Sequence, residues 1–99
     1  MIDFSKIVGF DWYIGNSTKN EKHEVSQIES EQIFLNEPLL LLPDAKHGVS
    51  EQRIHALGKT DLDRLLHITF TLRFNASKIR VISARDMHRK ERVIYEKTT

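Results

Sequence analysis

The chain has 99 residues, of which 39% are hydrophobic and 29% charged, a composition that predicts one domain, residues 1–99, with a modest core. No apolar run approaches the roughly 20 residues of a membrane-spanning helix. The first ten residues include Asp3 and Lys6 and lack the apolar centre of a signal peptide. Cysteine is absent, which excludes disulfides and thiolate metal sites, so we expect a cytoplasmic protein.

The formal net charge of +1 hides an uneven distribution of charge along the chain. Residues 1–72 carry 7 Lys and Arg against 11 Asp and Glu, a balance of −4. Residues 73–99 carry 8 against 3, a balance of +5. A basic C-terminal region in a nearly neutral chain can attract a polyanion to one end of the molecule, although a solvated basic helix explains the same charges.

The N-terminal third predicts a strand and one or two helices. Ile7 to Trp12 predicts a short strand, because the turn residues Gly15-Asn16-Ser17 follow it. Residues 18–23 are polar and weakly helical. Ser26 and Glu29 then form a capping box that predicts a helix through residue 34, which the Asn-Glu-Pro sequence at 36–38 ends.

Four strands are predicted after this helix. The four leucines at 39–42 are too few for a helix and lie between two prolines, so they predict a strand. A polar loop is expected at 44–51. The three following strands are predicted at Arg53–Leu57, Arg64–Phe74 and Lys78–Ala84. Their short connections favour antiparallel pairing.

A closing helix completes the predicted α+β fold, with Asp86 as its N-cap and Glu96 near its end. Met87, Ile94 and Val93 are its candidate apolar residues. The fold expected is an N-terminal strand with one or two helices, an antiparallel sheet of four to five strands, and a C-terminal helix.

Side chains alternate across a strand, and this alternation sorts the predicted sheet into two faces. The apolar face contains Ile54, Ala56, Leu66, Ile68, Phe70, Leu72, Ile79 and Val81. The opposite face contains Arg53, His55, His67, Thr69, Thr71, Arg73, Arg80 and Ala84. Leu57, Leu65 and Ile82 form an apolar patch at its edge, which the closing helix can cover.

The polar face carries three arginines and two histidines but no carboxylate from the strands themselves. Guanidinium groups bind phosphate oxygens through a planar fork of donors, so this face is a candidate nucleic-acid site. An ordinary solvated sheet face is the alternative. The five histidines show no i, i+4 pair, and neither a glycine-rich phosphate loop nor an HExxH motif occurs, so we expect no metal site.

The most specific stretch is Arg80-Val81-Ile82-Ser83-Ala84-Arg85, followed by Arg89, Glu91, Arg92 and Tyr95. Further short motifs occur along the chain in this order: Phe10-Asp11-Trp12, Asn20, Lys22-His23, Pro38, Lys46-His47, Glu51 with Arg53, and Ala56-Leu57-Gly58. In this arrangement the chain resembles the BrnT family of toxins from type II toxin–antitoxin pairs. Three positions depart from the family pattern: Tyr13, Glu24 and the turn at 75–77.

The resemblance implies a RelE-like fold and a cofactor-free endoribonuclease that inhibits translation. It also implies neutralisation by a BrnA-type ribbon-helix-helix antitoxin, assembly as a dimer or heterotetramer with it, and contact with operator DNA only through that complex. A non-catalytic module that binds RNA or the antitoxin is the alternative.

Site residues follow from the polar face together with the resemblance. We expect Arg53 and Arg80 to hold the scissile phosphate, and Glu51 or His47 to transfer the proton, with His55 and His67 as alternatives for that step. The residues expected to bind RNA are Arg73, Arg85, Arg89, Arg92, His55 and His67.

Overall fold

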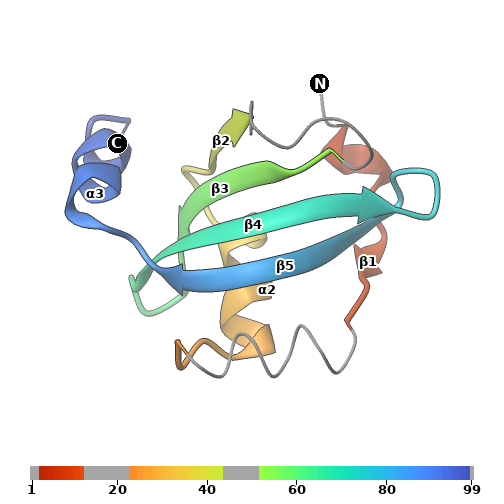
Figure 1. Ribbon diagram of the computed structural model, residues 1–99, viewed down its shortest axis with the longest axis horizontal. Coiled ribbons are helices and arrows are strands. Elements are labelled where there is room, and N and C mark those ends of the chain that lie inside the picture. The colour runs from red at the N-terminus through yellow and green to blue at the C-terminus, as the bar shows by residue number, and fades with distance from the viewer. Residues whose placement is uncertain (1–2, 13–22, 44–51, 99) are drawn as a thin grey trace.

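The computed structural model describes residues 3–12, 23–43 and 52–98 and shows an α+β fold, as predicted (Figure 1). The expected turn at 15–17, most of the weakly helical stretch at 18–23 and the loop at 44–51 lie outside these residues. The elements in chain order are a 3-10 helix η1 (Phe4–Lys6), β1 (Gly9–Phe10), α2 (Gln27–Leu35), β2 (Leu40–Pro43), β3 (Ile54–Lys59), β4 (Leu65–Arg73), β5 (Lys78–Asp86) and α3 (Arg89–Glu96). None of the helices described has the length and apolar character needed to cross a membrane.

The five strands form one mixed sheet in the order β1-β5-β4-β3-β2. The pairs β3–β4 and β4–β5 are antiparallel, which confirms the pairing expected from the short connections, and β2–β3 is antiparallel as well. The first strand adds a parallel pair, because Gly9 and Phe10 lie beside Lys78 and Ile79 of β5. In Figure 1 the sheet faces the viewer, α2 crosses behind it, and α3 lies beyond one end.

The apolar face of the sheet packs on α2 and forms the main core. Leu66, Ile68 and Phe70 of β4 are fully buried, as the alternation predicts. Ile33 of α2 comes so close to β3 that a Cβ added to Gly58 would lie 3.0 Å from the Cβ of Ile33. Glycine at position 58 therefore permits this close approach of helix and sheet.

The predicted start of α2 is confirmed. The backbone N–H of Glu29 donates to Ser26 Oγ at 3.0 Å, and the backbone N–H of Ser26 donates to Glu29 Oε1 at 3.0 Å. These bonds satisfy two donors that a helix N-terminus leaves unpaired. The helix ends one residue later than predicted, at Leu35, with Asn36 as its C-cap.

A β-bulge in β5 changes the face on which the end of this strand displays its side chains. Thr69 pairs with Ser83, but its neighbour Phe70 pairs with Val81, so Ile82 is the extra residue. The alternation therefore shifts by one position after Ile82. The outward placement predicted for Ala84 is wrong, because Ala84 is fully buried in the main core.

The predicted start of the C-terminal helix is also wrong. Strand β5 continues two residues beyond the prediction, to Asp86, and α3 begins at Arg89 with His88 as its N-cap. Glu91 stabilises this start by accepting a hydrogen bond from the backbone N–H of His88 at 2.8 Å. The carboxylate of Asp86 instead accepts two hydrogen bonds from Arg64.

A second, smaller core lies under α3. It consists of Leu57, Met87 and Tyr95, with Leu40, Leu42 and Leu65 packed against it. Thus α3 covers Leu57 and Leu65 as expected, but Ile82 is not part of this cluster. Of the apolar residues predicted for the helix, Met87 is buried in this core but precedes α3, and the other two are wrong. Ile94 and Val93 are 46% and 48% exposed, whereas Tyr95 is buried and its hydroxyl donates to the carbonyl oxygen of Pro38 at 2.7 Å.

Candidate functional site

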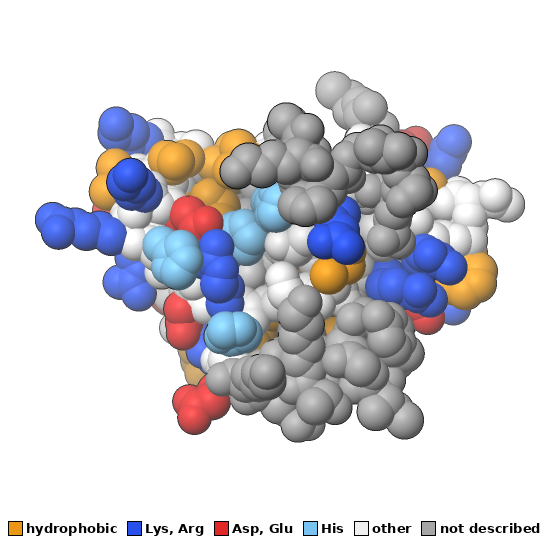
Figure 2. All heavy atoms as spheres, viewed as in Figure 1, with side chains coloured by type: hydrophobic (Ala, Val, Ile, Leu, Met, Phe, Trp, Pro, Cys, Tyr) orange, Lys and Arg blue, Asp and Glu red, His pale blue; other side chains and the backbone are white. Residues whose placement is uncertain are grey.

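The polar side chains of β3, β4 and β5 share one side of the sheet, opposite α2, which we call the outer face. It contains Arg53, His55, His67, Thr69, Thr71, Arg73, Lys78, Arg80, Ser83 and Arg85. Figure 2 shows histidine side chains (pale blue) on this side of the molecule, beside basic (blue) and acidic (red) side chains. The bulge places Arg85 here, because an unbroken alternation from Arg80 would turn it toward the core.

Strand pairing arranges these side chains in rows across the sheet. Thr71 pairs with Arg80. Arg53 directly precedes β3, and continuing the register of Ile54 with Phe70 by one residue puts it level with Thr71 on the other side. Neighbouring strands lie about 4.8 Å apart, so the two arginines flank Thr71 at backbone positions roughly 10 Å apart. The Thr71 hydroxyl donates to the carbonyl oxygen of Gln52 at 2.7 Å, which holds the segment before β3 against β4.

The next two rows contain the predicted histidines. His55, Thr69 and Ser83 form one row, and Leu57, His67 and Arg85 form the next. Each row lies about 7 Å further along the strands. The rings of His55 and His67 have centroids 5.0 Å apart, and Thr69 Oγ1 lies 3.0 Å from His55 Nδ1.

His67 is held in its neutral form. It is only 8% exposed, and this burial, together with the nearby positive charge of Arg85, lowers its pKa to about 4. Its Nδ1 is buried without a hydrogen-bond partner among the described residues, and its Nε2 lies 3.7 Å from Glu91 Oε2. His55 is more accessible to solvent, so it is the better placed of the two to reach a ligand.

Arg85 is held by Glu91 of α3. Its Nη1 and Nη2 donate to the two carboxylate oxygens at 2.8 and 3.0 Å. Burial alone would raise the pKa of Glu91, but the hydrogen bonds from Arg85 and from the backbone N–H of His88 lower it to about 2. Glu91 therefore remains ionised and fixes α3 relative to the end of β5.

Arg80 also has an acidic partner from another element. Its Nε donates to Asp11 Oδ2 at 2.8 Å, and its Nη2 contacts the same oxygen. The two residues on either side of Asp11 make other contacts. Phe10 packs against the main core, and Trp12 Nε1 donates to Glu31 at 2.8 Å. The outward positions of the described strands supply no carboxylate, but Asp11 and Glu91 bring two to the outer face.

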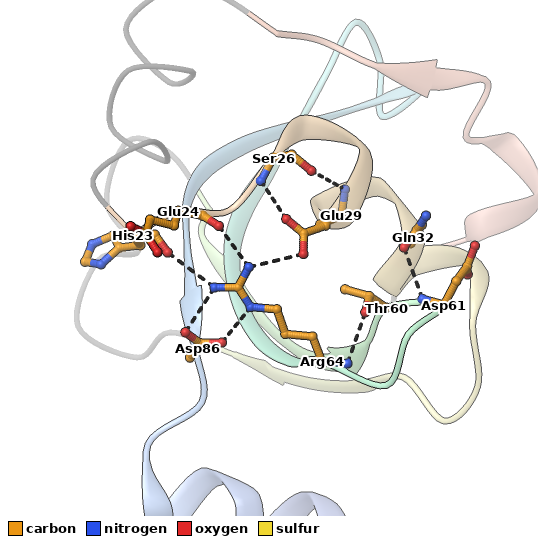
Figure 3. Close-up of polar contacts among 9 residues, drawn as sticks. All are labelled: His23, Glu24, Ser26, Glu29, Gln32, Thr60, Asp61, Arg64 and Asp86. Atoms are coloured by element: carbon orange, nitrogen blue, oxygen red, sulfur yellow. Dashed lines mark hydrogen bonds and ion pairs between the residues drawn. The ribbon is translucent and has the colours of Figure 1, made fainter.

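Sequence reasoning missed the role of Arg64, which joins three separate segments (Figure 3). Its guanidinium donates to both oxygens of Asp86, to Glu29 at 3.1 Å, and to the carbonyl oxygens of His23 and Glu24. These bonds lower the pKa of Asp86 and raise that of Arg64. The start of α2 is thereby fixed to the end of β5.

The remaining predicted residues lie around this arrangement. Arg73 is exposed at the end of β4, and Arg89 and Arg92 are exposed on α3, beyond the opposite end of the outer face. His47 and Glu51 lie outside the described residues, so the structure does not place them. Within residues 3–12, 23–43 and 52–98, no group of three or more His, Asp or Glu side chains is arranged to hold a metal ion.

Comparison with known proteins identifies a family that is consistent with a basic, histidine-bearing face. The family described as "Ribonuclease toxin, BrnT, of type II toxin-antitoxin system" matches residues 12–91. A search of curated proteins found no match. The family match includes α2, all three strands of the outer face and the start of α3. The chain therefore belongs to the BrnT family of ribonuclease toxins of type II toxin–antitoxin systems.

Proposed function

We propose that the outer face is the active site of a metal-independent endoribonuclease whose activity inhibits translation in the cytoplasm. The observation that carries this proposal is Arg80 opposite Thr71 with His55 in the next row, and the register of β3, continued by one residue, adds Arg53 on the other side of Thr71. Two guanidinium groups on either side of one position suit a phosphate between them.

The reaction requires no cofactor, because RNA supplies its own nucleophile. The 2′-oxygen forms a bond to phosphorus, its proton passes to a general base, and the bond from phosphorus to the 5′-oxygen breaks as that oxygen takes up a proton. The products are a 2′,3′-cyclic phosphate and a 5′-hydroxyl. Arg53 and Arg80 stabilise the additional negative charge on the phosphoryl oxygens in the transition state.

His55 is the described residue best placed to transfer a proton. It is partly exposed, Thr69 orients its ring, and its row is adjacent to the arginine row. His67 is too deeply buried to reach a substrate and supports the ring of His55 from behind. His47 and Glu51 precede β3 in the chain and remain candidates for the second proton-transfer group.

The remaining arginines bind flanking phosphates. Arg85 lies two rows, or about 13 Å, from Arg80, and Glu91 holds it toward α3, so the two arginines bind different phosphates. Arg89 and Arg92 extend the basic surface beyond Arg85, and Arg73 extends it at the other end. Exchanging any of these three should weaken binding and reduce its dependence on salt.

The test is incubation of purified protein with RNA in the presence of a metal chelator. Shortened RNA supports an enzyme, whereas RNA that is bound without being shortened indicates the alternative, a non-catalytic module. Co-purification with a BrnA-type antitoxin, and loss of cleavage in that complex, tests the proposed partner. The mass of the complex distinguishes the two assemblies that we expect, a dimer and a heterotetramer.

A further inference from the structure

The turn between β4 and β5 exposes an aromatic side chain in a strained backbone conformation. Phe74 is 61% exposed and has φ 55°, and Asn75 and Ala76 follow with φ 57° and 63°. The left-handed region costs a residue with a Cβ about 1–2 kcal/mol, and asparagine tolerates it best. Phenylalanine at this position therefore neither fills a core nor suits the turn, and strain of this kind is concentrated at functional sites.

Phe74 forms part of the wall of a hollow of about 520 Å³ at the same end of the sheet. The other lining residues are Gln52, Ile54, Thr71, Leu72, Arg73 and Asn75, so the hollow lies at the end of β4 and shares Thr71 with the row of Arg80. Its volume lies within the roughly 300–1,000 Å³ of ordinary ligand sites. The hollow therefore has room for a flat ring next to the proposed cleavage site.

Two basic side chains lie beside Phe74. Arg73 and Lys78 form the last cross-strand pair of the hairpin, and Lys78 Nζ lies 5.6 Å from the centroid of the Phe74 ring. Figure 2 shows basic side chains (blue) beside a hydrophobic one (orange) at this end of the sheet. Leu62 is more exposed, at 92%, but its neighbours in sequence are the acidic Asp61 and Asp63.

We propose that this hollow binds an unpaired nucleobase of the RNA substrate, stacked on Phe74, while Arg73 and Lys78 hold the adjoining phosphate. Proteins bind single-stranded nucleic acid by combining a basic path with aromatic rings on which bases stack. The row of Arg73 and Lys78 lies about 7 Å from that of Arg80, so the base belongs to a nucleotide next to the scissile phosphate. The proposal rests on the proposed function for the identity of its ligand.

The experiment measures binding of a fluorescent single-stranded oligoribonucleotide whose 2′-hydroxyls are methylated, so that it cannot be cleaved. Phe74→Leu keeps an apolar side chain and the backbone strain but removes the aromatic ring, and it should weaken binding between about 5-fold and 150-fold. Phe74→Tyr keeps a ring and should bind like the wild type. Leu62→Ala is the matched control for loss of an exposed apolar side chain, and it should also leave affinity unchanged.

A single abasic nucleotide, moved along the probe, locates the stacked base. At one position it should weaken binding to the wild type but not to Phe74→Leu. The proposal is overturned if the wild type binds the probe and Phe74→Leu binds it equally well. It is also overturned if Phe74→Leu loses affinity for the antitoxin but not for the probe. The proposed function itself fails, and this inference with it, if the wild type neither binds the probe nor cleaves unmodified RNA.

Discussion

Replacing Arg80 by alanine should affect catalysis much more than stability. The ion pair with Asp11 has side chains that are 25% and 21% exposed, and losing a hydrogen-bonded pair of this kind costs about 1–2 kcal/mol of unfolding free energy. Loss of a donor aimed at developing negative charge costs about 2.7–4 kcal/mol of transition-state stabilisation, or roughly 10²–10³ in rate. Single-turnover cleavage of an oligoribonucleotide and urea denaturation measure these two effects separately.

The matched control is Asp11→Asn, which breaks the same ion pair but keeps the guanidinium. It should lower stability by a similar amount and change the cleavage rate less than about 10-fold, because the arginine is still available to the phosphate. The reasoning is refuted if both variants lower the cleavage rate equally, since Arg80 would then act only by holding Asp11 and β1 in place.

Three further outcomes follow from the same structure. Arg64→Ala should lower the unfolding free energy by about 2–3 kcal/mol in urea, and Arg64→Lys should recover less than half of this loss, because one ammonium group cannot replace a fork bonded to three segments. His67 has a folded-state pKa of about 4, so as the pH falls the unfolded chain takes up a proton on this histidine before the folded protein does. The free energy of unfolding should therefore fall by up to about 1.4 kcal/mol per pH unit from pH 6.5 towards 4. A His67→Gln variant whose unfolding free energy has the same dependence on pH would contradict this. Phe74→Asn should raise the free energy of unfolding by about 1 kcal/mol, and with it the thermal midpoint, while weakening RNA binding. A lower midpoint would argue against backbone strain at this turn.

Features determined by neighbouring residues could be predicted from the sequence. The Ser26–Glu29 capping box depends on residues three apart, and it formed as predicted. The two faces of β4 follow from alternation alone, and the predicted core residues of that strand are buried or packed on the core. The family match was also available from short motifs in a fixed order.

Features determined by distant contacts could not be predicted. An aspartate after a strand resembles a helix N-cap, but Asp86 binds Arg64, which lies 22 residues earlier. The bulge at Ile82 leaves no mark in an apolar run, yet it moves Ala84 into the core and Arg85 onto the outer face. Both prediction errors arise because long-range pairing outweighs local preference.

The acidic side chains of the candidate site illustrate the same limit. Asp11 lies 69 residues from Arg80 in the chain, and no local pattern links them. Glu91 lies six residues from Arg85, but only the bulge and the late start of α3 bring the two groups together. Arg80 was therefore identified from strand alternation and Arg85 from the motif that resembles the BrnT family, whereas the groups that orient them were not identified.

The most direct test of RNA cleavage by this basic face is the chemistry of the cut ends. Purified protein, incubated with an end-labelled oligoribonucleotide in a chelator, should yield fragments that end in a 2′,3′-cyclic phosphate and begin with a 5′-hydroxyl. Neither fragment should form from a probe with methylated 2′-hydroxyls. Cuts that leave a 5′-phosphate, or RNA that stays intact at every enzyme concentration, would contradict a mechanism in which the 2′-oxygen attacks phosphorus.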